Sequence, residues 1–96
     1  MLKIRCEKNG NVKIYYLEGE IDTPRAKYLS EEIDVSGCDE IVFDMEKLEY
    51  TTSSGIRVLM GTNLIMKEKG GRISVRNVNT YVDEIFDLTG FYTVIA

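Results

Sequence analysis

The 96-residue chain has no histidine, and its two cysteines lie far apart in the sequence. Histidine is the commonest general base and the commonest metal ligand, so its absence removes the usual basis for both kinds of chemistry. Cys6 and Cys38 do not form a CxxC motif, which argues against a zinc site, and a disulfide is disfavoured in a reducing compartment. We interpret both cysteines as small apolar residues and expect no metal, no cofactor and no catalytic site.

Long apolar runs and basic patches are also missing. No run approaches the roughly 20 residues that a membrane-spanning helix needs. The first residues, MLKIRCEKNG, lack the apolar core and small-residue cleavage site of a secretory signal. A net charge of −4 argues against nucleic-acid binding. We therefore expect one cytoplasmic domain over residues 1–96, without direct contact to nucleic acid or membrane.

The first third of the chain predicts a β-hairpin and a helix. Residues 2–6 alternate between apolar and polar side chains, residues 12–17 are rich in strand-forming residues, and Asn9-Gly10 between them is a strong turn signal. Pro24 suits the first position of a helix over residues 24–34, with Thr23 as its N-cap. An apolar stripe on this helix is formed by Ala26, Leu29 and Ile33.

The rest of the chain alternates between strands and helices. The predicted elements are a buried strand at 40–45, a helix at about 55–69, a strand at 72–76, a helix that Asn79 or Thr80 caps and Gly90 ends, and a last strand within YTVIA. Asp83 follows Thr80 by three residues, as in a capping box. The order of strand, strand, helix, strand, helix, strand, helix, strand predicts an α/β domain with a mixed, mostly parallel sheet and about three helices.

A run of four hydroxyl residues and a glycine, Thr51 to Gly55, precedes the second helix. In open α/β sheets, functional groups gather at the carboxyl ends of the strands, and the start of a helix attracts anions. One reading is that a single hydroxyl caps the helix. The other is that a hydroxyl is there to be phosphorylated, since a phosphate of −1.5 to −2 charges would repel a docked partner without unfolding the domain. Gly55 would let another surface approach the backbone closely.

Four segments together resemble a known family: LEGEIDTPRAKYL, IVFDMEKLEYTTSSGIRVLM, KGGRISVRNV and DEIFDLTGFYTVI. They are similar to the STAS domain and, within that superfamily, to bacterial anti-sigma factor antagonists, over nearly the whole chain. The family motif Asp-Ser-Ser-Gly corresponds here to Thr52-Ser53-Ser54-Gly55. The resemblance implies a non-enzymatic protein that binds an anti-sigma factor and so frees a sigma factor for RNA polymerase.

The resemblance also implies how such binding is regulated. The anti-sigma factor is usually a serine kinase that phosphorylates the serine before the motif glycine, and a PP2C-type phosphatase reverses this. That serine corresponds to Ser54, with Ser53 and Thr52 as the next candidates. Thr52 departs from the usual aspartate, and some family members have no phosphoacceptor. A second hypothesis is therefore a non-phosphorylated STAS adaptor or scaffold of a transport or sensory complex.

Further residues complete the candidate partner surface, which comprises Asp22, Thr52, Ser53, Ser54, Gly55, Arg57 and Gly61. Asp22 is either a helix-start charge or, by the resemblance, a neighbour of the Ser54 loop. The apolar arc of the second helix is wider than one buried face needs, which indicates deep packing or a partner groove.

Asp44 is expected to end the central strand near the same edge. A nucleotide-binding protein is disfavoured because GxxxxGK is absent. We expect a monomer or weak dimer.

Overall fold

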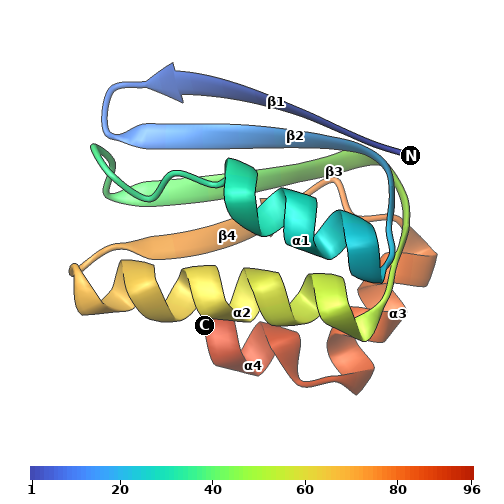
Figure 1. Cartoon of the computed structure of the whole chain (residues 1–96). Coiled ribbons are helices and arrows are strands. Elements are labelled where there is room, and N and C mark those ends of the chain that lie inside the picture. The colour runs from blue at the N-terminus through green and yellow to red at the C-terminus, as the bar shows by residue number, and fades with distance from the viewer.

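A computed structural model describes all residues from Met1 to Ala96. The elements in chain order are β1 (Leu2–Asn9), β2 (Val12–Ile21), α1 (Thr23–Glu32), β3 (Glu40–Thr51), α2 (Ser53–Glu68), β4 (Arg72–Arg76), α3 (Thr80–Leu88) and α4 (Phe91–Ile95). The strands form one sheet in the order β1-β2-β3-β4 (Figure 1). β1 is antiparallel to β2, and the other neighbours are parallel. This confirms the α/β class and the mixed, mostly parallel sheet.

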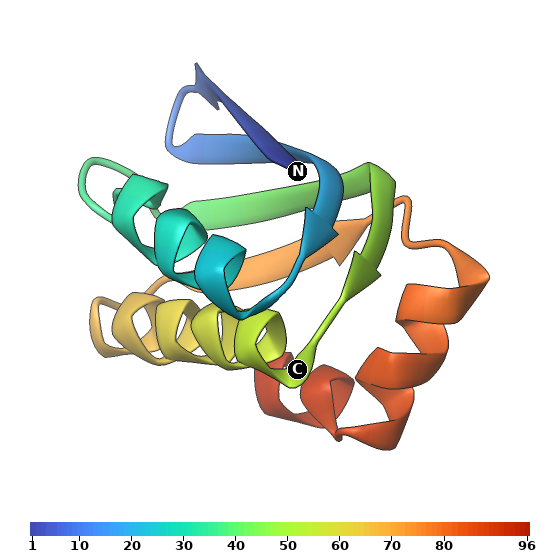
Figure 2. The same ribbon diagram turned by 45° about the vertical axis from the view of Figure 1, so that its right-hand side comes forward.

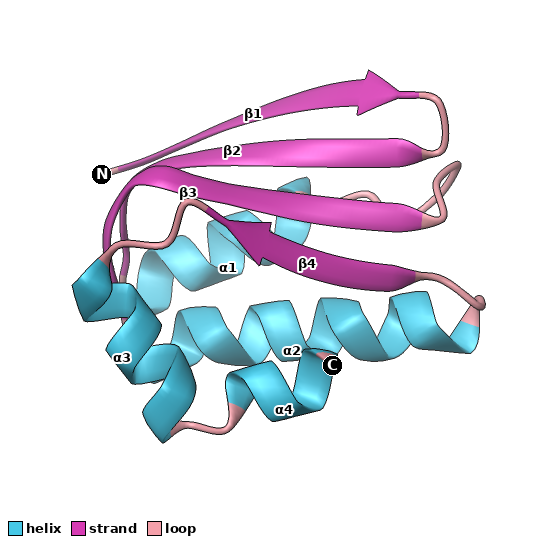
Figure 3. Ribbon diagram, turned by 180° about the vertical axis from the view of Figure 1, so that it is seen from behind, coloured by secondary structure: helices cyan, strands magenta, loops and turns pink.

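The helices cover one face of the sheet. α1 and α2 lie side by side, and α4 packs beside α2 (Figure 1). Alternate side chains of β2 and β3 point into this layer and are buried, among them Tyr15, Leu17, Ile41, Phe43 and Met45. In Figure 3, the view from behind, no helix covers β1, β2 or β3. The uncovered face carries mostly polar and charged residues, so the strands expose one side to solvent.

The last element is a helix, and the predicted C-terminal strand is wrong. Tyr, Thr, Val and Ile favour strands when taken alone. Gly90, however, adopts a left-handed conformation with φ of 74°, and its carbonyl accepts hydrogen bonds from the amides of Thr93 and Val94. This turn brings the fully buried Phe91 against Phe86, with ring centroids 4.3 Å apart. Burial of Phe91 in this way outweighs the local strand preference.

Two boundaries near the hydroxyl run also differ from the prediction. β3 continues to Thr51 instead of ending at residue 45, and α2 begins at Ser53. The expected loop is therefore a single residue, Thr52. Asp44 lies in the middle of β3, so it does not reach the strand's carboxyl end.

The predicted cap of α1 is wrong, and one of the two caps predicted for α3 is confirmed. α1 is capped by Asp22, whose carboxylate accepts from the Arg25 amide at 3.0 Å, and Thr23 is already helical. α3 is capped by Asn79, one of the two residues expected there, whose side-chain oxygen accepts from the Val82 amide at 2.8 Å. The capping box predicted from Thr80 and Asp83 does not form. Asp83 instead accepts a hydrogen bond from the hydroxyl of Tyr92 in α4.

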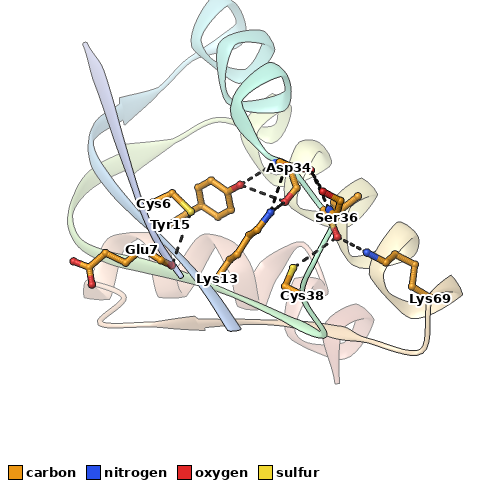
Figure 4. Close-up of polar contacts among 9 residues, drawn as sticks. Cys6, Glu7, Lys13, Tyr15, Asp34, Ser36, Cys38 and Lys69 are labelled. Carbon is orange, nitrogen blue, oxygen red and sulfur yellow. Dashed lines mark hydrogen bonds and ion pairs between the residues drawn. The ribbon is translucent and has the colours of Figure 1, made fainter. Parts of the chain in front are cut away.

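At the opposite end of the sheet, a polar cluster anchors the connection from α1 to β3 (Figure 4). The Lys13 ammonium donates to the Asp34 carbonyl at 2.8 Å, and the Asp34 amide donates to the Tyr15 hydroxyl at 2.8 Å. The amide and hydroxyl of Ser36 donate to the Asp34 carboxylate at 3.0 and 2.7 Å. Lys69, at the end of α2, binds the carbonyl of Val35. These contacts link β2, α2 and the connection far from the hydroxyl run.

Asp34 is expected to stabilise the fold at neutral pH but not in strong acid. The Ser36 amide, then its hydroxyl, lowers the pKa of Asp34 to about 2. Because this lies below the value of about 3.9 for an unfolded Asp, the contribution is complete above pH ~4 and is lost as the pH falls through 2. Urea unfolding between pH 7 and pH 2 should show Asp34→Asn less stable than wild type at pH 7, with the difference closing towards pH 2. Asp39→Asn controls for the loss of one negative charge, and a difference constant with pH would contradict the prediction.

Candidate functional site

Two parallel strands end side by side, and each is followed almost at once by a helix. Ile21 at the end of β2 and Thr51 at the end of β3 are register partners. One residue follows each strand, Asp22 or Thr52, before α1 or α2 begins. The first turns of the two helices are therefore neighbours (Figure 2). We call the surface formed by Asp22, Thr23, Thr52, Ser53 and Ser54 the helix-start edge.

Thr52 occupies the N-cap position of α2, but its side chain bonds to the neighbouring strand and not to the helix. Its amide and hydroxyl donate to the Ile21 carbonyl at 2.9 and 3.1 Å. The hydroxyl of Thr51 is also engaged, because it donates to the Thr52 carbonyl at 3.1 Å. No side chain caps α2, so the prediction that a member of the hydroxyl run does so is wrong. A carboxylate at position 52 could not donate as Thr52 does, which gives the departure from aspartate a structural role.

Asp22 places a negative charge on the helix-start edge. In addition to capping α1, its carboxylate forms an ion pair with the Arg25 guanidinium at 2.6 Å. The hydrogen bond from the Arg25 amide, followed by the attraction to its guanidinium, lowers the pKa of Asp22. Asp22 is therefore charged at neutral pH. The sequence suggested a helix-start charge or a neighbour of Ser54, and the structure shows that it is both a cap and part of the same edge.

The two serines of the edge differ in their surroundings. Ser53 is exposed, and its hydroxyl has no hydrogen-bond partner. Ser54 is half-buried, and its hydroxyl lies 3.1 Å from the hydroxyl of Thr23 in α1. The amides of both serines belong to the first turn of α2, where no carbonyl of the helix can accept from them. An anionic group on either serine would meet these donors and the positive end of the helix dipole.

Gly55 is buried beneath the edge, and another surface does approach its backbone closely, as expected. The surface that approaches is the domain itself. A Cβ atom at this position would lie 2.2 Å from Thr51 Oγ1 and 2.8 Å from Ile21 Cγ2. Glycine is thus needed for α2 to start against the ends of both strands.

The exposed face of α2 continues from the edge. Arg57 and Gly61 are exposed and follow Ser54 at helical spacing, so all three lie along one face. Leu64 extends this row and is 62% exposed. The partner surface predicted from the sequence did not include Leu64, although the wide apolar arc of the helix pointed to exposed apolar residues. Part of that arc is therefore surface and not deep packing.

Asp44 lies apart from this site, on the uncovered face of the sheet. It accepts hydrogen bonds from Arg76 at 2.8 Å and from Asn77 and the Glu46 amide at 3.1 Å. Burial acts to raise the pKa of Asp44, but these bonds lower it overall. A hollow of about 390 Å³ beside it is lined mainly by charges of both signs. No group of three or more His, Cys, Asp or Glu residues is arranged to hold a metal ion.

The profile of the STAS domain family matches residues 3–96. The chain belongs to the STAS domain family. The matched region includes the whole helix-start edge, with Ser53 and Ser54 at its surface and Gly55 buried beneath it. The resemblance inferred from the four segments is confirmed at the level of the family.

Curated relatives of this STAS domain have related names. The anti-sigma F factor antagonist of Paenibacillus polymyxa is 29% identical, over 97% of this chain and 83% of that protein. The anti-sigma-B factor antagonist of Bacillus subtilis strain 168 is 27% identical, over 98% of this chain and 88% of that protein.

Solved structures confirm the fold of the STAS domain. The anti-sigma factor antagonist SpoIIAA in its unphosphorylated form has a TM-score of 0.74 and 18% identity, over 88% of this chain and 82% of that one. The phosphorylated form of the Bacillus protein SpoIIAA has a TM-score of 0.73 and 17% identity, over 98% of this chain and 89% of that one. Separately, none of the helices of this domain has the length and apolar character needed to cross a membrane.

Proposed function

We propose that this STAS domain is an anti-sigma factor antagonist, switched off by phosphorylation of Ser54. In this role it binds an anti-sigma factor that is also a serine kinase, and so frees a sigma factor. It acts in the cytoplasm as a binding protein and not as an enzyme. The observation that carries the proposal is the position of Ser54: it is accessible at the start of α2, directly before the buried Gly55, in a domain whose curated relatives are named antagonists.

The proposed partner surface is the helix-start edge together with the exposed face of α2. The partner contacts are Asp22, Thr52, Ser53, Ser54, Arg57 and Gly61, and Gly55 shapes this surface from below. A PP2C-type phosphatase is proposed to remove the phosphate. The antagonist itself is proposed to act as a monomer or weak dimer.

Phosphorylation would change the charge of this surface more than its shape. A phosphoserine adds about −1.5 to −2 charges at neutral pH. Within the domain, the first-turn amides of α2 and the helix dipole would compensate for much of this charge. Asp22 already contributes a negative charge to the same edge. A partner with an acidic or apolar surface would therefore be repelled while the domain stayed folded.

Ser54→Asp is expected to bind the anti-sigma factor at least ~10-fold more weakly, because a negative charge then lies within the contact. Tagged wild type and variant would be used side by side in pull-downs from the native host, read by mass spectrometry. The affinity for the retrieved protein would then be measured by calorimetry. Ser30→Asp, on the exposed side of α1, is the matched control and should bind like wild type.

The same experiment separates the switch from the adaptor hypothesis. If wild type and Ser54→Asp retrieve the same membrane or scaffold proteins equally well, switching through Ser54 is wrong. Intact mass from native cells gives an independent check, because a phosphorylated fraction is heavier by about 80 Da, the mass of one added phosphate group. Ser53→Ala and Ser54→Ala then show which serine carries it.

A further inference from the structure

The hydroxyl of Ser54 has one side-chain partner in the domain, and this partner comes from another helix. Thr23 Oγ1 lies 3.1 Å from Ser54 Oγ, although the two residues are 31 positions apart in the chain. Each residue belongs to the first turn of its helix, Thr23 in α1 and Ser54 in α2. The contact therefore joins the two helices at the helix-start edge.

The position of Thr23 is well determined by its neighbours. Asp22 before it binds the Arg25 amide at 3.0 Å, which holds the first turn of α1. On the other side, Thr52 is bonded to the Ile21 carbonyl through its amide and its hydroxyl, which holds the start of α2 against β2. The two hydroxyls are thus brought together by the backbone on both sides, and the meeting does not depend on a long flexible side chain.

We propose that Thr23 is a positioning residue for Ser54, which holds the acceptor hydroxyl in one orientation and thereby favours phosphorylation of Ser54 over Ser53. This inference rests on the proposed function, because it concerns the same modification. Ser53 is the more exposed of the two serines, so exposure alone would select it. The Ser53 hydroxyl makes no hydrogen bond within the domain that would select one rotamer, whereas the Ser54 hydroxyl contacts Thr23.

The restraint bears on the transfer step itself. A phosphoryl group passes from ATP on the kinase to Ser54 Oγ: a new O–P bond forms, the bond between the γ-phosphorus and ADP breaks, and the serine proton leaves to a base of the kinase. Transfer of this kind depends mainly on the alignment of the attacking oxygen with the leaving group. Thr23 can donate its proton to Ser54 Oγ, which leaves the proton of Ser54 free to depart.

The role of Thr23 persists after transfer. Ser54 Oγ is then an ester oxygen without a proton, so only Thr23 can donate in this contact. Its hydroxyl is placed to donate to the ester oxygen or to a neighbouring phosphate oxygen. The same residue would therefore orient the acceptor before the reaction and the phosphoserine after it.

Thr23→Val removes the hydroxyl and keeps the shape of the side chain, and Thr23→Ser keeps the hydroxyl. Thr80→Val is the matched control, because Thr80 is an exposed threonine at the first position of α3 and its hydroxyl makes no hydrogen bond. NMR couplings between Hα and Hβ of Ser54 report the side-chain orientation without any partner. Phosphorylation would be followed with labelled ATP and the kinase that wild type retrieves, with mass spectrometry to assign Ser53 or Ser54.

Thr23→Val is expected to average the Ser54 couplings and to lower kcat/KM for phosphorylation by ~2–10-fold, the range for loss of one hydrogen bond. The share of label on Ser53 should rise, and Thr23→Ser should restore the wild-type behaviour. Unchanged couplings and an unchanged rate in Thr23→Val, with wild type phosphorylated normally, would overturn the role of Thr23 alone. If the kinase does not label wild type, the proposed function fails as well, and the couplings still show whether Thr23 orients the hydroxyl.

Discussion

Phe86→Ala is expected to lower the free energy of unfolding by ~3–5 kcal/mol, the usual cost of removing a fully buried phenylalanine. Phe86 has no exposed surface. Its ring lies 4.3 Å from that of Phe91 and 5.7 Å from that of Tyr92, measured between centroids. The loss would leave a cavity between α3 and α4. Both aromatic contacts between the two helices, those of Phe91 and Tyr92, are made with Phe86.

Urea unfolding of wild type and variant measures this loss. Leu88→Ala is the matched control, because Leu88 is on the same helix and is 80% exposed. It should change stability by no more than ~0.5 kcal/mol. Phe86→Leu, a smaller truncation, keeps the measurement possible if Phe86→Ala does not fold. A loss below 1 kcal/mol in Phe86→Ala would show that α3 and α4 do not pack as described.

Gly55→Ala is expected to destabilise the domain by ~1–3 kcal/mol, the range for overpacking. The added methyl group would lie 2.2 Å from Thr51 Oγ1 and 2.8 Å from Ile21 Cγ2, both closer than atoms can approach. Thr51 and Ile21 are themselves buried and belong to strands in the middle of the sheet. Relief of the clash therefore requires the side chains of Thr51 and Ile21 to leave their packed positions, or the start of α2, which carries Ser54, to move.

Gly61→Ala is the matched control within the same helix. A Cβ atom at position 61 would have no atom within 4 Å. Alanine is favoured over glycine in a helix by up to ~1 kcal/mol, so this variant should be more stable than wild type. The opposite signs of the two glycine substitutions distinguish close packing from helix propensity. Equal effects would contradict the packing described for Gly55.

Local signals were enough to predict most of the fold. Asn9-Gly10 predicted the hairpin, and Gly10 indeed has a φ of 61°. The apolar core of residues 40–45 predicted a central strand, and β3 lies between two parallel neighbours. In each case the residues that predict the element lie within it or directly beside it, as turn residues or as a pattern of apolar and polar side chains.

The hydroxyl run could not be resolved in this way, because its partners are distant in the sequence. Thr52 binds Ile21 and Ser54 contacts Thr23, in both cases across 31 residues. Locally, all four hydroxyl residues are suitable caps, yet no hydroxyl makes a capping hydrogen bond to α2. The register of Ile21 with Thr51 decides their roles, and register is a property of the assembled sheet.

The conformation of the C-terminal segment also depends on a contact outside the segment. The residues of YTVIA favour a strand by propensity, which is weak compared with burial. Phe91, the residue immediately before them, decides the outcome by packing on Phe86. The partner of Phe91 lies in the preceding helix, so the helical conformation depends on tertiary contact.

The one-residue connections at Asp22 and Thr52 have a consequence for the thermodynamics of docking. A binding surface carried on long loops loses backbone freedom when a partner orders it, at roughly 1–2 kcal/mol per residue. Here the backbone carbonyl of Asp22 accepts from Ala26 and the amide of Thr52 donates to Ile21, so both connections are already ordered. Little conformational entropy therefore remains to be lost on binding. The affinity of the surface is then determined mainly by the contacts and charges of its side chains. Under the proposed switch, a single phosphate would be a sufficient signal, because no rearrangement of the chain is needed to transmit it.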